Sequence, residues 1–360
     1  MAVLNAWQRP DRVLKGMMWG DFKEGIGTIS TSPNVFATVT GSAGSVNAVA
    51  GSTSFANGDL VALYQTIGSG AGQWEFNLIT AGGGTNNLTF KVANHYAYAS
   101  GAQIIKVLRY KTATISAHSI SGWNGSVGGV EFILAGKNAV ISGAINAAAL
   151  GFYGGAESNN NSTPGQQGYS YAGSPGNSRN PNYSGGGGGS ESPGGGAGHA
   201  GAGSQGSGGN AGLGGGASDD STDGTKMYLG SGGGGACHGD PAYASGGGSG
   251  GGLVVVIAKN ITNSSSISTN GSPSGASNDR RGGSGSGGYV LLVCETASLG
   301  SNTITSDGAT SNNGGASSVG RIAVQHKGTV TGTTYPTFTD VVDPTLKQKP
   351  KGGAFLLEFL

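Results

Sequence analysis

Four apolar blocks share one pattern along this chain, and sequence dominated by glycine separates them. Each block opens with glycine, continues as an apolar strand and closes on polar residues; the blocks cover 129–138, 252–260, 288–295 and 320–327. A second short strand follows each block, within 139–145, 261–268, 299–305 and 329–331. A strand pair that recurs every ~30 to 40 residues is typical of a solenoid. The first interval is longer because the glycine-rich segment 151–251 lies inside it.

The glycine-rich inserts occupy equivalent places in this repeat. They cover 151–251, 271–288 and 307–318, and each returns to the first strand of the next repeat. Equivalent positions of a solenoid stack above one another. We therefore expect all three inserts to leave the scaffold at the same corner and to lie side by side.

Parts of the inserts have a period of three residues. Glycine recurs at every third position in three runs: Gly195, Gly198 and Gly201; Gly203, Gly206, Gly209, Gly212 and Gly215; and Gly282, Gly285 and Gly288. Three residues per turn is the polyproline II repeat, which has no internal hydrogen bonds. Collagen shares the period, but its other positions are rich in proline, whereas these carry Ser, Gln, Asn, Ala and Leu. The pattern favours a bundle of glycine helices that exchange backbone hydrogen bonds. A flexible linker is the alternative that composition alone favours.

The sequence before the first repeat predicts a docking arm and a small barrel. The arm, residues 1–45, is rich in large apolar side chains, namely Trp7, Leu14, Met17, Met18, Trp19 and Phe22. Such residues usually mark a contact with a partner or with the next domain. Residues 46–111 alternate apolar and polar positions between glycine or asparagine turns, which predicts an antiparallel barrel or sandwich.

The predicted fold class is therefore all-β: a small antiparallel barrel or sandwich, then a short β-solenoid with a glycine-rich polyproline II bundle inserted. We expect the solenoid at 112–150 and 252–332. We expect 333–360 to be a tail whose apolar end docks on a neighbour or on the barrel.

Charge and cysteine content narrow the range of partners. Charged residues make up 10% of the chain and the formal net charge is +1, so the basic stripe of a nucleic-acid binder is missing. The longest apolar runs fall far short of the ~20 residues that span a bilayer, so no membrane insertion is expected. No secretory signal is visible, and two cysteines make no disulfide framework. A protein without a secretory signal can still become extracellular if it is a virion component, because virions leave their host by lysis.

Glycine triplet runs interleaved with polar, aromatic-tipped loops resemble the distal adhesins of T-even-type phage tail fibres. The resemblance is one of pattern and covers about residues 151–290. It implies a receptor-binding domain built as a polyglycine II sandwich, with recognition in the loops between glycine runs. The barrel and the solenoid that precede these runs are not part of that family's usual plan.

The candidate receptor-binding residues are the aromatic, histidine and methionine side chains between the glycine runs: Tyr169, Tyr171, Tyr183, His199, Met227, Tyr228, His238 and Tyr243. Tyrosine offers a large contact area with a polar end at low entropy cost. A glycine bundle has no side chains to bury these rings, so many of them should cap its ends or face water. The alternative is that they seal the bundle against the β scaffold.

No cofactor, metal site or catalytic residue is expected. The acidic turn 219–224 lacks the glutamate that an EF-hand needs at its twelfth position, where Gly230 stands. Cys237, His238 and Asp240 are too close in sequence for a nucleophile, base and orienting acid. Glu131 and Glu295 fall at different places in their repeats and do not form a recurring acid pair.

The function we expect is that of a tail-fibre adhesin, not an enzyme. Its partners would be a host surface glycan or outer-membrane protein, and other virion tail proteins or copies of itself. A structural virion or filament subunit is the alternative, and a polysaccharide depolymerase is a third possibility. Ice binding needs regular Thr or Ala rows, which the triplet runs do not carry.

Overall fold

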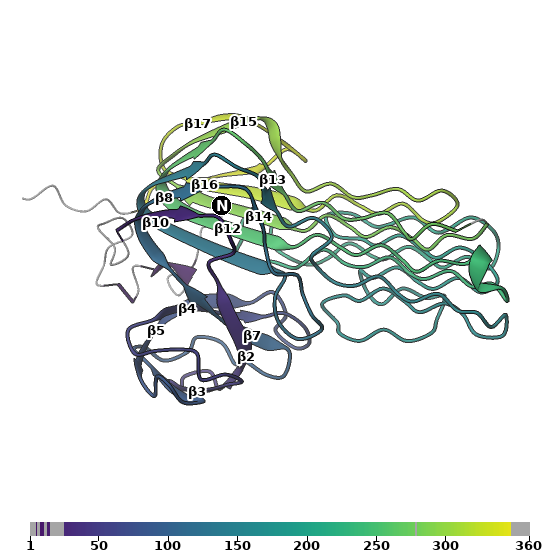
Figure 1. The fold of residues 1–360 in the computed structure, drawn as a ribbon, viewed down its shortest axis with the longest axis horizontal. Helices are drawn as coiled ribbons and strands as arrows, with labels where there is room; N and C mark the ends of the chain where they lie inside the picture. The colour runs from purple at the N-terminus through teal and green to yellow at the C-terminus, as the bar shows by residue number, and fades with distance from the viewer. Residues whose placement is uncertain (1–4, 6–7, 11–12, 15–24, 278, 347–360) are drawn as a thin grey trace, which may run out of the picture.

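The computed structural model describes residues 5, 8–10, 13–14, 25–277 and 279–346. A small barrel lies against a curled parallel sheet, and the glycine-rich segments extend side by side from one end of that sheet (Figure 1). A short 3-10 helix, η3 (Pro241–Tyr243), lies at the far end of this extension. We call the extension the projection.

The barrel is antiparallel and closed. Its strands are β2 (Val35–Gly41), β3 (Asn47–Ala50), β4 (Leu60–Gln65), β5 (Trp74–Ala81), β6 (Asn87–Phe90) and β7 (Ala102–Val107). They follow the order β2-β3-β6-β5-β4-β7 around the barrel. The barrel begins at Val35 rather than at residue 46, because β2 pairs with both β3 and β7 and closes the ring. The expected docking arm is shorter by that strand.

The second sheet is parallel and curls on itself. Its strands are β1 (Ile26–Ile29), β8 (Arg109–Ile115), β9 (His118–Ser119), β10 (Val130–Ile141), β11 (Ile145–Asn146), β12 (Leu253–Asn263), β13 (Ile267–Ser268), β14 (Tyr289–Cys294), β15 (Thr296–Thr305), β16 (Arg321–His326), β17 (Val330–Tyr335) and β18 (Thr339–Val342). The apolar blocks pair in register, because Leu253 lies opposite both Val130 and Tyr289. The first half of β12 pairs with β14 and the second half with β15, so the sheet turns a corner within one strand.

The parallel sheet includes strands on both sides of the ranges 112–150 and 252–332 that the sequence predicted for it. β1 lies in the expected arm but pairs in parallel with β8, and β17 and β18 continue the sheet past residue 332. Leu14 packs against the core from the N-terminal side, and Leu346 is buried in it. The other apolar residues proposed for the arm, and residues 347–360 of the tail, lie outside the described residues.

Three apolar clusters stabilise the described β parts, and one of them, with Leu63 and Phe90 among its members, lies inside the barrel. The other two involve the parallel sheet. One fills the inside of the curl, with Ile133, Val256 and Leu292 among its members. The other lies between the barrel and the parallel sheet, where the ring centroids of Trp74 and Phe132 are 5.5 Å apart. Large aromatic rings supply much of the apolar area in such an interface.

A buried histidine–carboxylate pair joins the short strand β9 to the long strand β10. His118 Nε2 lies 3.0 Å from Glu131 Oε1, and His118 Nδ1 lies 2.9 Å from the carbonyl oxygen of Ser116. Burial of the ring opposes its protonation, but the hydrogen bond to Glu131 and its charge outweigh burial and raise the pKa of His118. The protonated ring therefore stabilises the folded chain.

We expect Phe132→Ala to lower the free energy of unfolding by about 3 to 5 kcal/mol, because it leaves a cavity between barrel and sheet. Thr262→Ala, at an exposed position of β12, should change the free energy by less than about 0.5 kcal/mol. Chemical denaturation of the two variants beside the natural chain measures both effects. Equal losses would contradict the placement of Phe132 in this interface.

The raised pKa of His118 predicts a loss of stability on the alkaline side. Its contribution is fully present below about pH 6.5, the ordinary histidine value, and is lost as pH rises through the folded-state pKa. Melting temperatures measured between pH 6 and pH 9 should therefore fall less in His118→Gln than in the natural chain. A difference between the two proteins that stays constant over this range would rule out the ionic pair.

Candidate functional site: the glycine-rich projection and its loops

In the segment 230–236 of the projection, backbone N–H groups donate hydrogen bonds to the backbone carbonyl groups of three neighbouring segments. Gly230, Gly233 and Ala236 donate to Gly251, Gly248 and Ser245 of one neighbouring segment; Gly232 and Gly235 donate to Tyr169 and Gln166 of a second; Gly234 donates to Gly195 of a third. For the first two neighbours the donor therefore returns at every third residue, whereas Ser231, three residues before Gly234, donates to Ser286 Oγ.

The carbonyl groups of the same segment accept hydrogen bonds from three further segments, and the acceptors for each of these segments are three residues apart. Phe152, Gly155 and Ser158 donate to Gly230, Gly233 and Ala236; Gly186 and Gly189 donate to Gly232 and Gly235; Gly283 and Ser286 donate to Gly234 and Ser231. One segment is thus bonded to six neighbours through its backbone alone.

This packing leaves no space for side chains. A Cβ atom on Gly234 would lie 2.0 Å from the carbonyl oxygen of Gly187, and one on Gly233 would lie 2.1 Å from that of Gly283. Both distances are far below van der Waals contact. Glycine is required here because backbones approach each other directly.

Backbone bonds also join the three inserts to one another. Ala197 donates to Ser284, Ser284 donates to Gly315, and Gly315 donates to Gly194. The run of glycines from 203 to 215 is not one continuous segment, because Gly206 donates to Gly212 and Gly203 to Gly215. The chain reverses between these pairs, so the triplet period persists through a turn.

Six of the eight candidate residues lie at the base of the projection, near the barrel and the sheet: Tyr169, Tyr171, Tyr183, His199, Met227 and Tyr228. Tyr171 stacks on Tyr228 with ring centroids 4.1 Å apart, and its carbonyl accepts from Gly68 of the barrel. Tyr64 Oη of the barrel donates to the carbonyl of Met227 over 2.9 Å. Met227 and Tyr228 are buried, so the expectation of exposed tips fails for them: they seal the projection against the barrel.

Tyr169 and Tyr183 differ in exposure. The half-buried ring of Tyr169 lies 5.5 Å from that of Trp123 and 6.1 Å from that of Tyr153. Tyr183 is 67% exposed, but its ring lies 5.9 Å from Tyr171 and therefore also at the base.

His199 is buried in an ionic network that ties the first insert to the sheet. Its Nε2 lies 2.8 Å from Asp220 Oδ2, and its Nδ1 lies 2.6 Å from the carbonyl oxygen of Gly287. Arg321 Nε, at the start of β16, donates to the other oxygen of Asp220 over 2.8 Å. His199 is therefore a structural residue, not an exposed receptor contact.

The remaining two candidates, His238 and Tyr243, lie at the far end. Their rings are 5.2 Å apart, and Tyr243 is 40% exposed. Hydrogen bonds connect the loops of this end: His238 to Ser158, Arg280 to Tyr243, Ser190 to Asn210, and Ser207 to Asn313. We call the segments 158–163, 190–192, 207–210, 238–244, 275–277, 279–281 and 310–314 the distal loops. Sequence reasoning missed most of them because their residues are Asn, Ser, Gly and Arg rather than aromatic.

The side chains of the acidic turn and of the Cys237 cluster, for which no metal or catalytic role is expected, make contacts within the protein. Asp219 accepts hydrogen bonds from Lys226 Nζ and Tyr228 Oη, and Asp223 accepts from Thr225. Cys237 Sγ donates to the carbonyl of Asn160, while His238 Nδ1 accepts from the backbone of Asp240. Within the described residues, no three His, Cys, Asp or Glu side chains are grouped to hold a metal ion.

The two glutamates weighed as glycosidase acids are both engaged. Glu131 pairs with His118 inside the protein, and Glu295 Oε2 lies 3.5 Å from Lys259 Nζ. Each carboxylate therefore has its own ionic partner in this structure.

Comparison of the chain with protein-family models, curated proteins and solved structures found no match in any of the three. Among the residues that the structure describes, no helix has the length and apolarity needed to cross a membrane.

Two glycine substitutions test the packing of the projection. Gly234→Ala places a methyl group against the Gly187 carbonyl, whereas Gly209→Ala meets no atom within 4 Å. We expect limited proteolysis to cut the projection of Gly234→Ala at least about tenfold faster, because overpacking of a tight core typically costs ~1 to 3 kcal/mol. Gly209→Ala should be cut at the natural rate, and identical rates for both variants would contradict the close packing.

Proposed function

We propose that this protein is a phage tail appendage, an adhesin that binds a receptor on the host surface through the distal loops. In this proposal the curled sheet is a short β-solenoid, and the projection is a bundle of glycine polyproline II helices. The receptor is a surface glycan or an outer-membrane protein. Other virion tail proteins or copies of this chain hold the opposite end, and the protein acts in the virion and is not an enzyme.

The register of the parallel strands supports the solenoid. Tyr289 lies opposite both Leu253 and Arg321, so successive repeats stack directly above one another. The hydrogen bonds of 230–236, which return at every third residue to five of its six neighbours, support the polyproline II bundle, whose helix has three residues per turn.

One observation carries the proposed binding role: backbone bonds among all three inserts bring their loops to a single surface far from the barrel (Figure 1). Loops held on a rigid scaffold bind without first losing conformational entropy. Asn, Ser and Gly are common in the distal loops, and Tyr243 adds one tyrosine; these are also residue types that adaptable binding loops favour.

The exposed edges of the parallel sheet support the alternative function, that of a structural virion or filament subunit. Ile26 on the edge strand β1 is 78% exposed, and Val342 on β18 is 50% exposed. Exposed edge strands are able to pair with another chain. End-to-end stacking of copies would then be the function, with the projection pointing sideways.

Two tyrosines of matched exposure separate the adhesin from the structural subunit. Tyr243 is 40% exposed in the distal loops, and Tyr153 is 42% exposed near the base. We expect Tyr243→Ala to weaken host-cell adsorption roughly thirtyfold, since a central aromatic contact contributes about 2 kcal/mol. Tyr153→Ala should adsorb normally, and both variants should assemble into particles.

Normal adsorption by a Tyr243→Ala, Arg280→Ala double variant would overturn the adhesin proposal. Failed particle assembly in an Ile26→Lys variant that still adsorbs as isolated protein would add a structural role. The structural subunit would be favoured if the Ile26→Lys variant fails to assemble into particles while the Tyr243→Ala, Arg280→Ala double variant still adsorbs normally.

A further inference from the structure

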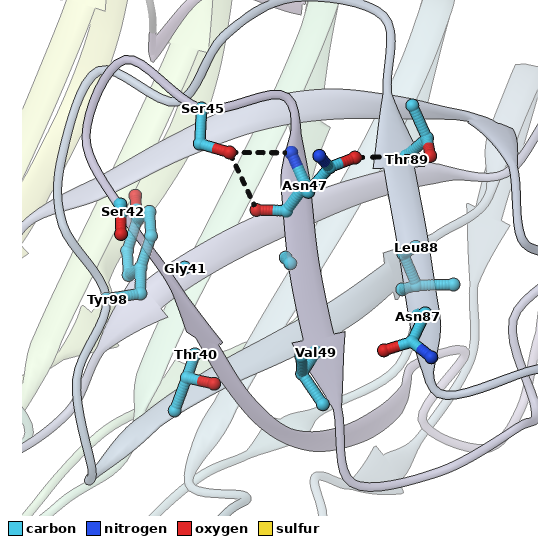
Figure 2. Close-up of a pocket in the computed structure, with 11 residues that line it drawn as sticks. Thr40, Gly41, Ser42, Ser45, Asn47, Val49, Asn87, Leu88, Thr89 and Tyr98 are labelled. Carbon is cyan, nitrogen blue, oxygen red and sulfur yellow. Dashed lines mark hydrogen bonds between the residues drawn. The ribbon is translucent and has the colours of Figure 1, made fainter.

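A groove of about 610 Å³ lies on the barrel, over β2, β3 and β6 (Figure 2). It is lined by Thr40, Gly41, Ser42, Ser45, Asn47, Ala48, Val49, Asn87, Leu88, Thr89 and Tyr98. No lining residue carries a charge at neutral pH. The volume falls in the range of known ligand sites, ~300 to 1,000 Å³.

Neutral hydrogen-bonding groups surround this groove. The side chains of Thr40, Ser42 and Asn87 are exposed and make no hydrogen bond to the described residues. The side-chain oxygen of Asn47, Oδ1, accepts a hydrogen bond from Thr89 Oγ1 at 3.4 Å, which leaves the side-chain NH2 group of Asn47 as a donor at the groove (Figure 2). Hydroxyl and amide groups each donate and accept, so these four residues match a ligand rich in hydroxyl groups.

The groove also has an apolar surface. Val49, which is 51% exposed, lines the groove together with the buried Leu88 of the neighbouring strand β6 (Figure 2). An apolar patch bordered by hydroxyl and amide groups complements a pyranose ring, which has C–H faces and a hydroxyl rim.

One wall of the groove is held by a buried carboxylate. Glu75 is fully buried and accepts hydrogen bonds from the backbone of His95, from that of Tyr96 and from Tyr98 Oη. Tyr98 in turn pairs directly with Gly41, on the same side of the groove, through two backbone bonds. A wall fixed in advance lowers the entropy cost of binding.

Other ligand classes fit the groove less well. Ionic ligands would find no countercharge among the lining residues. A peptide that binds by strand addition needs a free sheet edge, and β2, β3 and β6 are each paired on both sides in the closed barrel. The exposed apolar area is too small for an acyl chain, since Val49 is its main exposed residue.

We propose that the barrel groove binds a neutral oligosaccharide, independently of the distal loops. Thr40, Ser42, Asn47 and Asn87 bond the hydroxyl groups of the sugar, and Val49 packs against a ring face. The protein then has two separate recognition surfaces, one on the barrel and one at the end of the projection.

Methyl NMR of the full chain tests this site directly. Maltohexaose, cellohexaose and mannohexaose are titrated in turn, with hexagalacturonate as the acidic comparison. With at least one neutral probe, the methyl signals of Val49 and Leu88 should shift, while that of Leu213, 38% exposed on the projection, should not.

Thr40→Ala combined with Asn87→Ala should weaken this binding at least about tenfold, because two hydrogen bonds are lost. Thr53→Ala, an exposed barrel threonine outside the groove, should bind normally.

Three outcomes overturn the proposal: no neutral probe shifts Val49 and Leu88, the double variant binds as tightly as the natural chain, or hexagalacturonate binds more tightly than every neutral probe. The double variant should retain the natural melting temperature, since both side chains are exposed and unbonded. Failure here leaves the adhesin proposal standing, because Tyr243→Ala tests a surface at the other end of the molecule.

Discussion

Backbone N–H and C=O groups in the glycine-rich projection find their partners in neighbouring segments. Gly234 donates to one segment and accepts from another, and a Cβ atom at its position would lie 2.0 Å from the backbone of a third. An unpaired buried amide costs about as much as a lost hydrogen bond. Each segment is therefore ordered only while its neighbours are, and the projection depends on mutual satisfaction of main-chain groups rather than on an apolar core.

The parallel sheet supplies the alignment that this mutual bonding needs. Gly252, Gly288 and Gly320 stand directly before β12, β14 and β16, which pair in register. The segments that return from the projection therefore enter the sheet at one level, one strand apart. The barrel braces the base from the side, because Tyr64 and Trp74 each donate a side-chain hydrogen bond to the loop that carries Met227.

The sequence predicted the all-β class and the barrel well, because apolar alternation and turn residues are local signals. It missed β2 as a barrel strand and β1 as part of the parallel sheet, since the partners of both are distant in sequence. It listed Met227 and Tyr228 as receptor contacts and left sealing against the β scaffold as the alternative, because it could not show that the loop 217–228 packs on the barrel. The polar groove went unnoticed: Thr40, Asn47 and Asn87 come from three strands and form no pattern along the chain.

Hydrogen exchange of the backbone amides in 230–237 tests the central claim most directly. Its N–H groups are bonded to surrounding segments rather than to water, so the account predicts protection comparable to that of the buried strand β12. Exchange at the rate of an unstructured glycine peptide, with β12 still protected, would contradict it and show that the glycine segments are loose tethers.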